Sequence, residues 1–485
     1  MSHLPLGRLV AGVLTVALAS VMAMTGARAQ EPVAADVAGP HPSHDPLDFL
    51  QAPPKPSTLK GKFSLVGVGE LLYSRPMADR DDPELQKVLE IVRAGDVAIA
   101  NREGPIFDAE TFSATGYGHG MLWGDGSLGR DTKAMGIDMV TLANNHSTDW
   151  GEAGLLETQR LHEEAGIVTV GAGRNLQEAR RAGILDTPQG RIALVGTAST
   201  FKANATANDA VGMVGARPGI STLRTRTIRR VDAQQMAAIR KLASDFASTR
   251  RPAPAADARE VTLGDQIYRL ADTPGLAYEM DLYDHAGLLK AVRDAKEEAD
   301  LVVFTIHAHE SPTGMDDDTP TPPDFLMTLF RNTVDAGADV VLGHGPHSMR
   351  GIEIYKGKPI FYGMGVFFIN GEIKALQESM FRMFPDASGR PPPPPPRERS
   401  VRPGGNPATW YDSVVAVTDF EDGKPVQVRL YPLDVGNTYD RSRRGIPHLA
   451  DPENARRILA DVQRYSEPFG TRIEIEDNIG IIRIH

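Results

Sequence analysis

Short apolar runs alternate with segments of helical spacing along most of the chain. Residues 63–68 and 97–100 have the length and composition of buried strands, and between them apolar side chains recur over 82–93 as on one helix face. The same alternation returns over 139–142 (strand), 154–165 (helix), 168–170 (strand) and 192–195 (strand). Strands that alternate with helices predict an α/β fold built on a layered sheet.

The alternation is interrupted between residues 201 and 300. This stretch contains segments of helical character rich in Ala and Arg, a loop over 250–258, and no apolar strand run before Leu301. We therefore expect a largely helical insertion at 201–300. Strand patterns resume over 301–306, 340–342 and 359–362, so the core sheet is expected to continue after the insertion.

A second interruption, at 371–407, is rich in proline. It contains six consecutive prolines, which favour a polyproline II spacer in an exposed loop over a partner-binding motif. Beyond it, the pair Asp422-Gly423 between two apolar runs predicts a hairpin turn, and 453–465 has helical spacing. Residues 408–485 are thus expected to complete the same domain with strands and a helix.

The N-terminus has the features of an export signal. Arg8 precedes an uninterrupted apolar and small-residue run over 9–24, and an Ala-x-Ala cleavage site follows. The run of about sixteen residues is shorter than the roughly 20 that span a bilayer, so a cleaved signal peptide at 1–29 fits better than an uncleaved anchor. Residues 30–60 are predicted to be a linker, and the protein is predicted to be periplasmic or extracellular.

Composition narrows the chemistry further. The chain has 52 Lys and Arg against 63 Asp and Glu, a formal net charge of −11, and this balance provides no basic field for nucleic acid. It also has no cysteine, which excludes disulfides, a thiolate nucleophile and thiolate metal ligands. Any bound metal ion must therefore be held by oxygen and imidazole ligands.

Polar side chains suited to metal binding follow five of the predicted strands. Each taken singly is more often a structural residue, but ligands gather at the carboxyl ends of strands in open α/β sheets, and the recurrence favours one shared site. Carboxylates, an amide and imidazoles suit Zn, Mn or Fe. In strand order these residues are Glu70, Glu103, Asn145, His146, His307, His309, Glu310, His344 and His347.

Five short blocks around these residues occur together in one order. They are NREGPI at 101–106, ANNH at 143–146, GAGRN at 171–175, GHGPH at 343–347 and GKPIFYGMG at 357–365. In that order they resemble the signature blocks of the CapA family of capsule proteins. The resemblance covers about 61–200 and 300–370, with a weaker echo near 431–432 and 469–471.

The resemblance implies a fold and a biological setting. The CapA family is associated with poly-γ-glutamate synthesis and belongs to the calcineurin-like metallophosphoesterase superfamily. The implied fold is a β-sandwich flanked by helices, with four α/β/β/α layers of the metallo-dependent phosphatase type. The implied domain spans 61–370 and contains the insertion at 201–300.

The resemblance also implies roles for individual residues. Glu70 falls at the first ligand, where the family usually has Asp, and Glu103 falls at the carboxylate that bridges two ions. His146 would contact or protonate the scissile group. Asn145 would be a further ligand, and His307 and His344 would hold one ion and His347 the other. Asp149, His309 and Glu310 are candidates for contacts around the ligands or with substrate, for which a structural role is equally expected.

One position departs from the superfamily pattern. The first superfamily motif has a His two residues after the acid, and the chain has Leu72 there. One of the two ions is therefore expected to bind weakly or not at all, so the expected content is one or two divalent ions per chain. The departure weakens a simple phosphatase interpretation.

These features together favour a metal-dependent hydrolase in which His146 protonates the leaving group. The expected role is synthesis, export or trimming of an extracytoplasmic polymer, first of all poly-γ-glutamate. A polyanionic polymer or a phosphoester is the expected substrate, and membrane-bound capsule synthesis proteins are the expected partners. Two alternatives stay open: a general periplasmic metallophosphoesterase, and a non-catalytic polymer-binding or assembly subunit.

Overall fold

The computed structural model describes residues 47, 50, 52–112, 122–315, 319–370, 408–440 and 443–484. The predicted signal peptide, most of the predicted linker and the proline-rich segment 371–407 lie outside the described residues. Among the described residues, no helix combines the length and the apolar composition needed to cross a bilayer.

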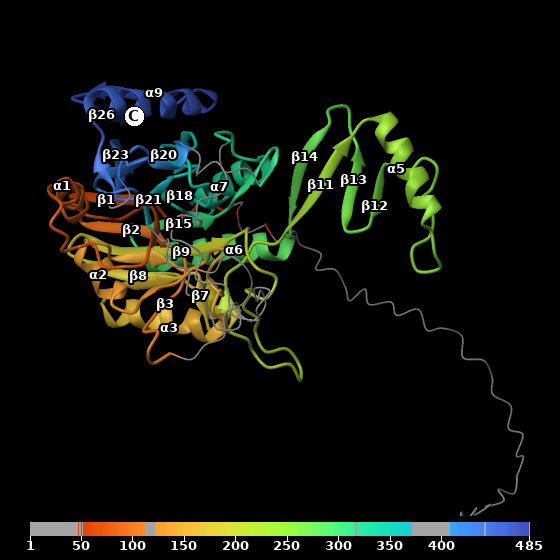
Figure 1. Cartoon of the computed structure of the whole chain (residues 1–485), viewed down its shortest axis with the longest axis horizontal. Coiled ribbons are helices and arrows are strands. Elements are labelled where there is room, and N and C mark those ends of the chain that lie inside the picture. Colours follow the sequence, from red (N-terminus) through yellow and green to blue (C-terminus); the bar gives the residue numbers. More distant parts are fainter. Residues whose placement is uncertain are drawn as a thin grey trace, which may run out of the picture. The chain divides into compact units, whose positions relative to one another are not determined.

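The larger of two main sheets (Figure 1) has its parallel strands in one half of the strand order, which ends at the edge strand β6. β1, β2, β5 and β6 are mutually parallel, β21 pairs in parallel with the far end of β1, and β22 pairs with β1 in antiparallel. Its strands are β1 (Lys62–Tyr73), β2 (Val97–Arg102), β5 (Met139–Thr141), β6 (Val168–Val170), β21 (Val366–Asn370), β22 (Asp412–Glu421), β23 (Lys424–Asp434), β24 (His448–Leu449), β25 (Glu474–Glu476) and β26 (Ile479–Arg483).

The second sheet has six strands in the order β19-β20-β18-β15-β9-β8. Its four inner strands are parallel, and both edge strands are antiparallel to their neighbours. They are β8 (Gly183–Thr187), β9 (Gly190–Ala198), β15 (Leu301–His307), β18 (Val340–His344), β19 (Ile352–Tyr355) and β20 (Lys358–Phe361).

Alternate residues of each central strand enter different apolar layers. In β1, Leu65 packs between the two sheets, whereas Val66 packs against the helices that cover the larger sheet. In β15, Val303 faces the larger sheet and Phe304 faces the helices on the opposite side. Because both faces of these strands are buried, their sequences are mostly apolar and do not alternate between apolar and polar residues. The predicted layered α/β fold is confirmed, with helix, sheet, sheet and helix in succession.

Helices cover both outer faces of the sheet pair. α1 begins after Asp82, whose carboxylate accepts the Leu85 N–H, and its buried side chains pack on the larger sheet. α6 and α7 bury apolar residues against the six-stranded sheet. The helices are α1 (Pro83–Arg93), α2 (Leu128–Ala134), α3 (Gly151–Glu164), α4 (Leu176–Arg180), α5 (Ala233–Asp245), α6 (Leu282–Glu298), α7 (Asp324–Ala336) and α9 (Pro452–Ser466).

The insertion corrects one expectation. Helices α5 and α6 are present, but strands also precede Leu301, so the insertion is mixed and not largely helical. Charged residues of neighbouring strands pair with one another, as Arg226 does with Glu279 and Arg269 with Glu260. These charged residues interrupt the strand sequences, which therefore lack the long apolar runs of the core strands. Four of its strands form one sheet in the order β12-β13-β11-β14: β11 (Thr225–Val231), β12 (Glu260–Leu263), β13 (Gln266–Leu270) and β14 (Gly275–Met280).

The segments at either end of the described domain are held by specific contacts. The Asp422-Gly423 pair forms the turn of the β22–β23 hairpin with positive φ at both residues, as predicted, and the helix predicted over 453–465 is α9. Strands β25 and β26 follow α9 and were not anticipated. Part of the predicted linker belongs to the folded domain, because Leu59 is buried between the sheets and the Ser57 hydroxyl donates to the Asp300 carbonyl.

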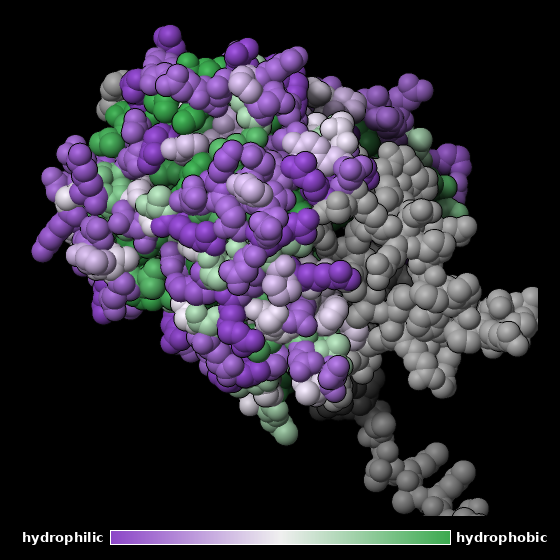
Figure 2. All heavy atoms as spheres, turned by 60° about the vertical axis from the view of Figure 1, so that its left-hand side comes forward, coloured by the Kyte–Doolittle hydropathy of each residue, from purple (hydrophilic) through white to green (hydrophobic). Residues whose placement is uncertain are grey.

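Hydrophilic residues cover most of the face in Figure 2, and apolar residues appear there in small separate groups. This mixture suits contact with water.

Candidate functional site

A break in the β1 ladder places Glu70. The pairing of β1 with β2 shifts register between Gly67 and Glu70, and from Glu70 onward β1 pairs with β21. At Gly69 the two backbones approach so closely that a Cβ would overlap the Gly365 carbonyl, so only glycine fits. The Glu70 N–H donates to that same carbonyl at 3.2 Å. The bulge therefore directs a fully buried carboxylate toward the six-stranded sheet.

The Glu70 carboxylate contacts the GHGPH turn that follows β18. One oxygen accepts the Gly345 N–H, the other contacts His347 Nδ1, and His307 Nδ1 lies 3.6 Å from the first. His347 has φ of 54°, a left-handed conformation uncommon for a non-glycine residue. Its ring centroid lies 4.4 Å from that of Trp410. The turn is thus shaped to present the imidazole to Glu70.

The end of β2 supplies the second carboxylate. Glu103 is 2% exposed, and its Oε1 lies 3.8 Å from His146 Nε2 and 4.0 Å from His307 Nε2. Next to it, the buried Arg102 guanidinium donates to the Leu71 and Tyr73 carbonyls, and burial lowers its pKa to about 10. These contacts hold the end of β2 in place and so position Glu103 near both His146 and His307.

The turn after β5 presents an amide and an imidazole. The Ser147 hydroxyl donates to the Leu142 carbonyl, and the Asn144 N–H donates back to that hydroxyl at 2.8 Å, which closes the turn. Within the described residues, the buried Oδ1 of Asn145 has no hydrogen-bond partner. His146 Nδ1 lies 2.9 Å from Asp149, so its Nε2 remains to face Glu103.

Two imidazoles lie side by side at the end of β15. The Nε2 atoms of His307 and His309 are 3.0 Å apart, and His307 Nδ1 lies 3.0 Å from the Asn101 amide nitrogen. Burial, reinforced by the surrounding imidazoles, holds the pKa of His307 well below its ordinary value. A neutral ring keeps a lone pair available to a metal ion.

His344 is placed differently from the other predicted ligands. Its Nδ1 lies 3.0 Å from the Thr305 hydroxyl and its Nε2 lies 3.1 Å from the Val68 carbonyl. Burial lowers the pKa of His344 to about 4. Both ring nitrogens are therefore engaged in hydrogen bonds, and the ligand role of His344 stays a prediction.

Two groups of ligand-type atoms emerge, and they share Glu103. One contains Glu103, His307 and His309, the other contains Glu70, Glu103 and His347, and the atoms within each lie within 4.8 Å of one another. These buried groups could hold a metal ion, because carboxylate oxygens and neutral imidazoles are the donors that divalent transition metals use. The Asn145 Oδ1 atom, next to His146 in the chain, is a further buried oxygen without a hydrogen-bond partner among the described residues.

Glu310 and Leu72 are two further positions considered from the sequence, and neither belongs to the two groups of ligand-type atoms. The Glu310 carboxylate accepts hydrogen bonds from the Ser199 and Thr200 hydroxyls at 2.8 and 2.9 Å, which gives it a structural setting. Leu72, at the position where the superfamily has a His, packs in the apolar layer between the larger sheet and its helices.

The sequence interpretation missed several residues of this site. Asn101 contacts His307, Trp410 packs on His347, and Lys202 pairs with Asp149. Asn101 lies in a block that had been singled out and follows a predicted strand, so the strand-end signal was available for it. Lys202 and Trp410 carry no local signal, because they come from remote segments.

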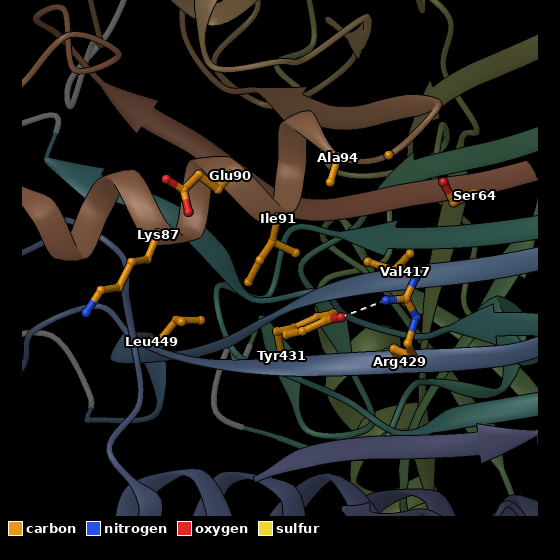
Figure 3. Close-up of a pocket in the computed structure, with 10 residues that line it drawn as sticks. Ser64, Lys87, Glu90, Ile91, Ala94, Val417, Arg429, Tyr431 and Leu449 are labelled. Carbon is orange, nitrogen blue, oxygen red and sulfur yellow. Dashed lines mark hydrogen bonds between the residues drawn. The ribbon is translucent and has the colours of Figure 1, made fainter. Parts of the chain in front are cut away.

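A separate pocket of about 420 Å³ lies between α1 and the β22–β23 hairpin (Figure 3). Ile91, Val417 and Tyr431 are among its lining residues, and no predicted site residue lines it. Its guanidinium, Arg429, contacts both the Tyr431 hydroxyl and the Asp419 carboxylate. Lys87, the other cation that lines the pocket, lies 2.9 Å from Glu84, so both cations are already paired with carboxylates.

The chain is similar to proteins from several bacteria. It is 37% identical over 441 residues to the uncharacterized protein y4sH of Sinorhizobium fredii, covering 87% of this chain and 93% of that protein. It is 26% identical to the capsule biosynthesis protein CapA of Bacillus anthracis, over 48% of this chain and 41% of that protein. It is 24% identical to the PGA biosynthesis protein CapA of Bacillus subtilis, over 59% and 56% respectively.

A solved structure of a hypothetical protein from Thermus thermophilus matches 76% of this chain and 99% of that one, with 15% identity and a TM-score of 0.33. The family of bacterial capsule synthesis proteins, PGA_cap, matches residues 64–371, which include the signature blocks and both ligand groups. The chain therefore belongs to this family of capsule synthesis proteins, the CapA family.

Proposed function

We propose that this protein is a metal-dependent hydrolase that acts on an extracytoplasmic polymer in capsule or poly-γ-glutamate synthesis. One observation carries the proposal: two groups of buried ligand-type atoms share the Glu103 carboxylate. A shared carboxylate between two cation sites is suited to a pair of ions that act on one substrate. Family membership supplies the biological setting.

The proposed cofactors are divalent Mn, Zn or Fe ions, one or two per chain. Such ions polarise a phosphoryl or carbonyl oxygen and lower the pKa of water. Glu103, His307 and His309 would hold one ion, and Glu70, Glu103 and His347 the other. Asn145 is a further donor through its buried Oδ1.

His146 is the proposed proton donor. Asp149 engages its Nδ1 and leaves Nε2, which faces Glu103 Oε1, to deliver a proton to the leaving group. The side chain of His146 is 22% exposed, whereas those of Glu70 and Glu103 are almost fully buried. His146 is therefore more accessible to a substrate from solvent than either carboxylate.

Substrate and location follow from the same proposal. Polymer synthesis outside the cytoplasm has no ATP, so hydrolysis or transfer fits an exported protein better than ligation does. A polyanionic chain, with poly-γ-glutamate first, or a phosphoester would be the substrate. Membrane-bound capsule synthesis proteins would be the partners, and export would use the predicted signal at 1–29.

The test is turnover by the purified protein with Mn²⁺ or Zn²⁺ on a panel of phosphomonoesters, phosphodiesters and γ-glutamyl amides. We expect metal-dependent turnover of at least one class, and we expect His146→Ala to abolish it while bound metal is retained. His162→Ala is a histidine control outside the cluster. Absent or metal-independent turnover across the panel would contradict the hydrolase proposal.

One alternative has observations in its favour. The position of Leu72 in the apolar layer and the engagement of both His344 nitrogens favour a non-catalytic binding or assembly subunit. Metal analysis separates the two, because a metal-free protein that still retains poly-γ-glutamate would support assembly. A general periplasmic phosphoesterase would instead turn over a chromogenic phosphodiester rapidly and leave γ-glutamyl amides intact.

A further inference from the structure

The carboxylate behind His146 has an unusually complete set of contacts. Asp149 is fully buried, and one of its oxygens accepts the Leu122 N–H and contacts His146 Nδ1. Its other oxygen contacts Lys202 Nζ. A buried carboxylate needs such partners, because desolvation otherwise opposes its ionised form.

Lys202 reaches this carboxylate from a distant segment. It follows β9 at the beginning of the insertion, where the hydroxyls of Ser199 and Thr200 are anchored on Glu310. The Lys202 carbonyl also accepts the Ala205 N–H at 2.8 Å. These contacts hold the backbone on both sides of Lys202, so its ammonium group contacts Asp149 from a defined position.

We propose that Lys202 is a positioning residue that holds Asp149 so that His146 Nε2 faces the reacting group. The inference rests on the proposed hydrolase function and deepens it, since it gives the insertion a part in the chemistry. Lys202 occupies one carboxylate oxygen and leaves the other to His146 and Leu122. Without the ammonium group, the carboxylate could rotate, and His146 would lose its fixed orientation.

The loss of Lys202 should affect only the transfer of a proton from His146 to the leaving group. The bond to the leaving atom breaks with its electron pair on that atom, which takes the proton from His146 Nε2. Water supplies the entering oxygen and releases one proton to solvent, solvent returns one proton to His146 Nε2, and the Nδ1–H group of His146 stays hydrogen-bonded to Asp149 throughout. A basic leaving group needs this proton more than an acidic one does, so leaving-group dependence reports on Lys202.

The experiment compares two substrates that differ only in leaving group. Methyl phenyl phosphate and methyl p-nitrophenyl phosphate are the pair if phosphodiesters turn over, and γ-glutamyl methylamide and γ-glutamyl p-nitroanilide are the pair if amides do. In Lys202→Met we expect kcat on the more basic leaving group to fall about 10- to 100-fold, part of a general acid's usual contribution, with KM unchanged. The loss on the nitro-substituted partner should be several-fold smaller, and Lys202→Arg should restore most of the rate.

Matched variants separate positioning from folding. Lys241→Met removes an exposed lysine of the same insertion, whose ammonium pairs with Asp245, and should leave both rates unchanged. Lys202→Gln keeps a hydrogen-bond donor without the charge and supplies the test if Lys202→Met does not fold. Equal losses on both substrates, or a loss that Lys202→Arg does not restore, would overturn the inference alone. An inactive wild type would overturn the proposed function and this inference together.

Discussion

Glu103 belongs to both groups of ligand-type atoms, so the loss of its charge should affect two cation sites at once. A ligand at about 100 times its Kd stabilises the folded state by about 2.7 kcal/mol, because it binds the folded chain alone. Two filled sites would therefore raise the free energy of unfolding by about 5 kcal/mol, and one by about 3 kcal/mol. Glu103→Gln should lose most of this gain.

Without metal, the sign of the Glu103→Gln effect should reverse. Glu70 and Glu103 are both buried in the same cluster, where ionised carboxylates are poorly solvated. A neutral amide avoids that desolvation, so the variant in chelator should equal or exceed the wild type, by on the order of 1 kcal/mol. Opposite signs with and without metal distinguish a lost ligand from a general loss of packing.

The assay is urea unfolding followed by circular dichroism, with EDTA or with saturating Mn²⁺ or Zn²⁺. His309→Asn and His347→Asn each remove a donor from one group and should each lose about half of the metal-dependent gain. Glu310→Gln is the control, because this buried carboxylate binds the Ser199 hydroxyl and lies outside both groups. A full metal-dependent gain in Glu103→Gln would refute the shared-ligand reasoning.

Three further changes test the fold around the site by urea unfolding. Burial lowers the pKa of His162 to about 4 from an ordinary 6.5, so its stabilising contribution is present above pH 6.5 and is lost as the pH falls toward 4, by about 3 kcal/mol. His162→Met should therefore lose less stability over that range, and an unchanged pH dependence would contradict this assignment. Gly69→Ala should cost about 2 kcal/mol or more, because its Cβ would overlap the Gly365 carbonyl, and a neutral result would show that the strands can separate there. Lys296→Met should cost about 3 kcal/mol, since it removes a buried partner of Asp339, and a loss below about 1 kcal/mol would speak against a buried-pair role.

The core layers could be predicted from sequence because their physical cause is local. Strands buried on both faces are apolar at most positions, as at 63–68 and 301–306, and such runs are visible without the structure. The strands of the insertion lacked this signal, since pairs such as Arg226–Glu279 occupy one face. The charged residues there do not alternate strictly with apolar ones, as β11 (TRTIRRV) shows, so the period-2 pattern that indicates a strand is absent from it.

Strand ends located the candidate site, but they could not fix the orientation of each side chain. His309 joins a ligand group and His344 does not, although both follow strands of the same sheet. The difference arises from a tertiary contact, because His344 Nε2 lies 3.1 Å from the Val68 carbonyl oxygen of the other sheet. Contacts from remote segments, such as Lys202 on Asp149, leave no pattern near the residues they serve.

Each ligand group also combines donors from both sheets. Glu103 follows β2 of the larger sheet, whereas His307 and His309 lie at the end of β15 in the six-stranded sheet, and Glu70 on β1 faces His347 beyond β18. Neither sheet supplies a complete group among the described residues. A cation bound here would therefore join the two layers directly, so its binding free energy would add to the apolar packing between them. Changes in that packing far from the ligands should then appear as changes in metal affinity.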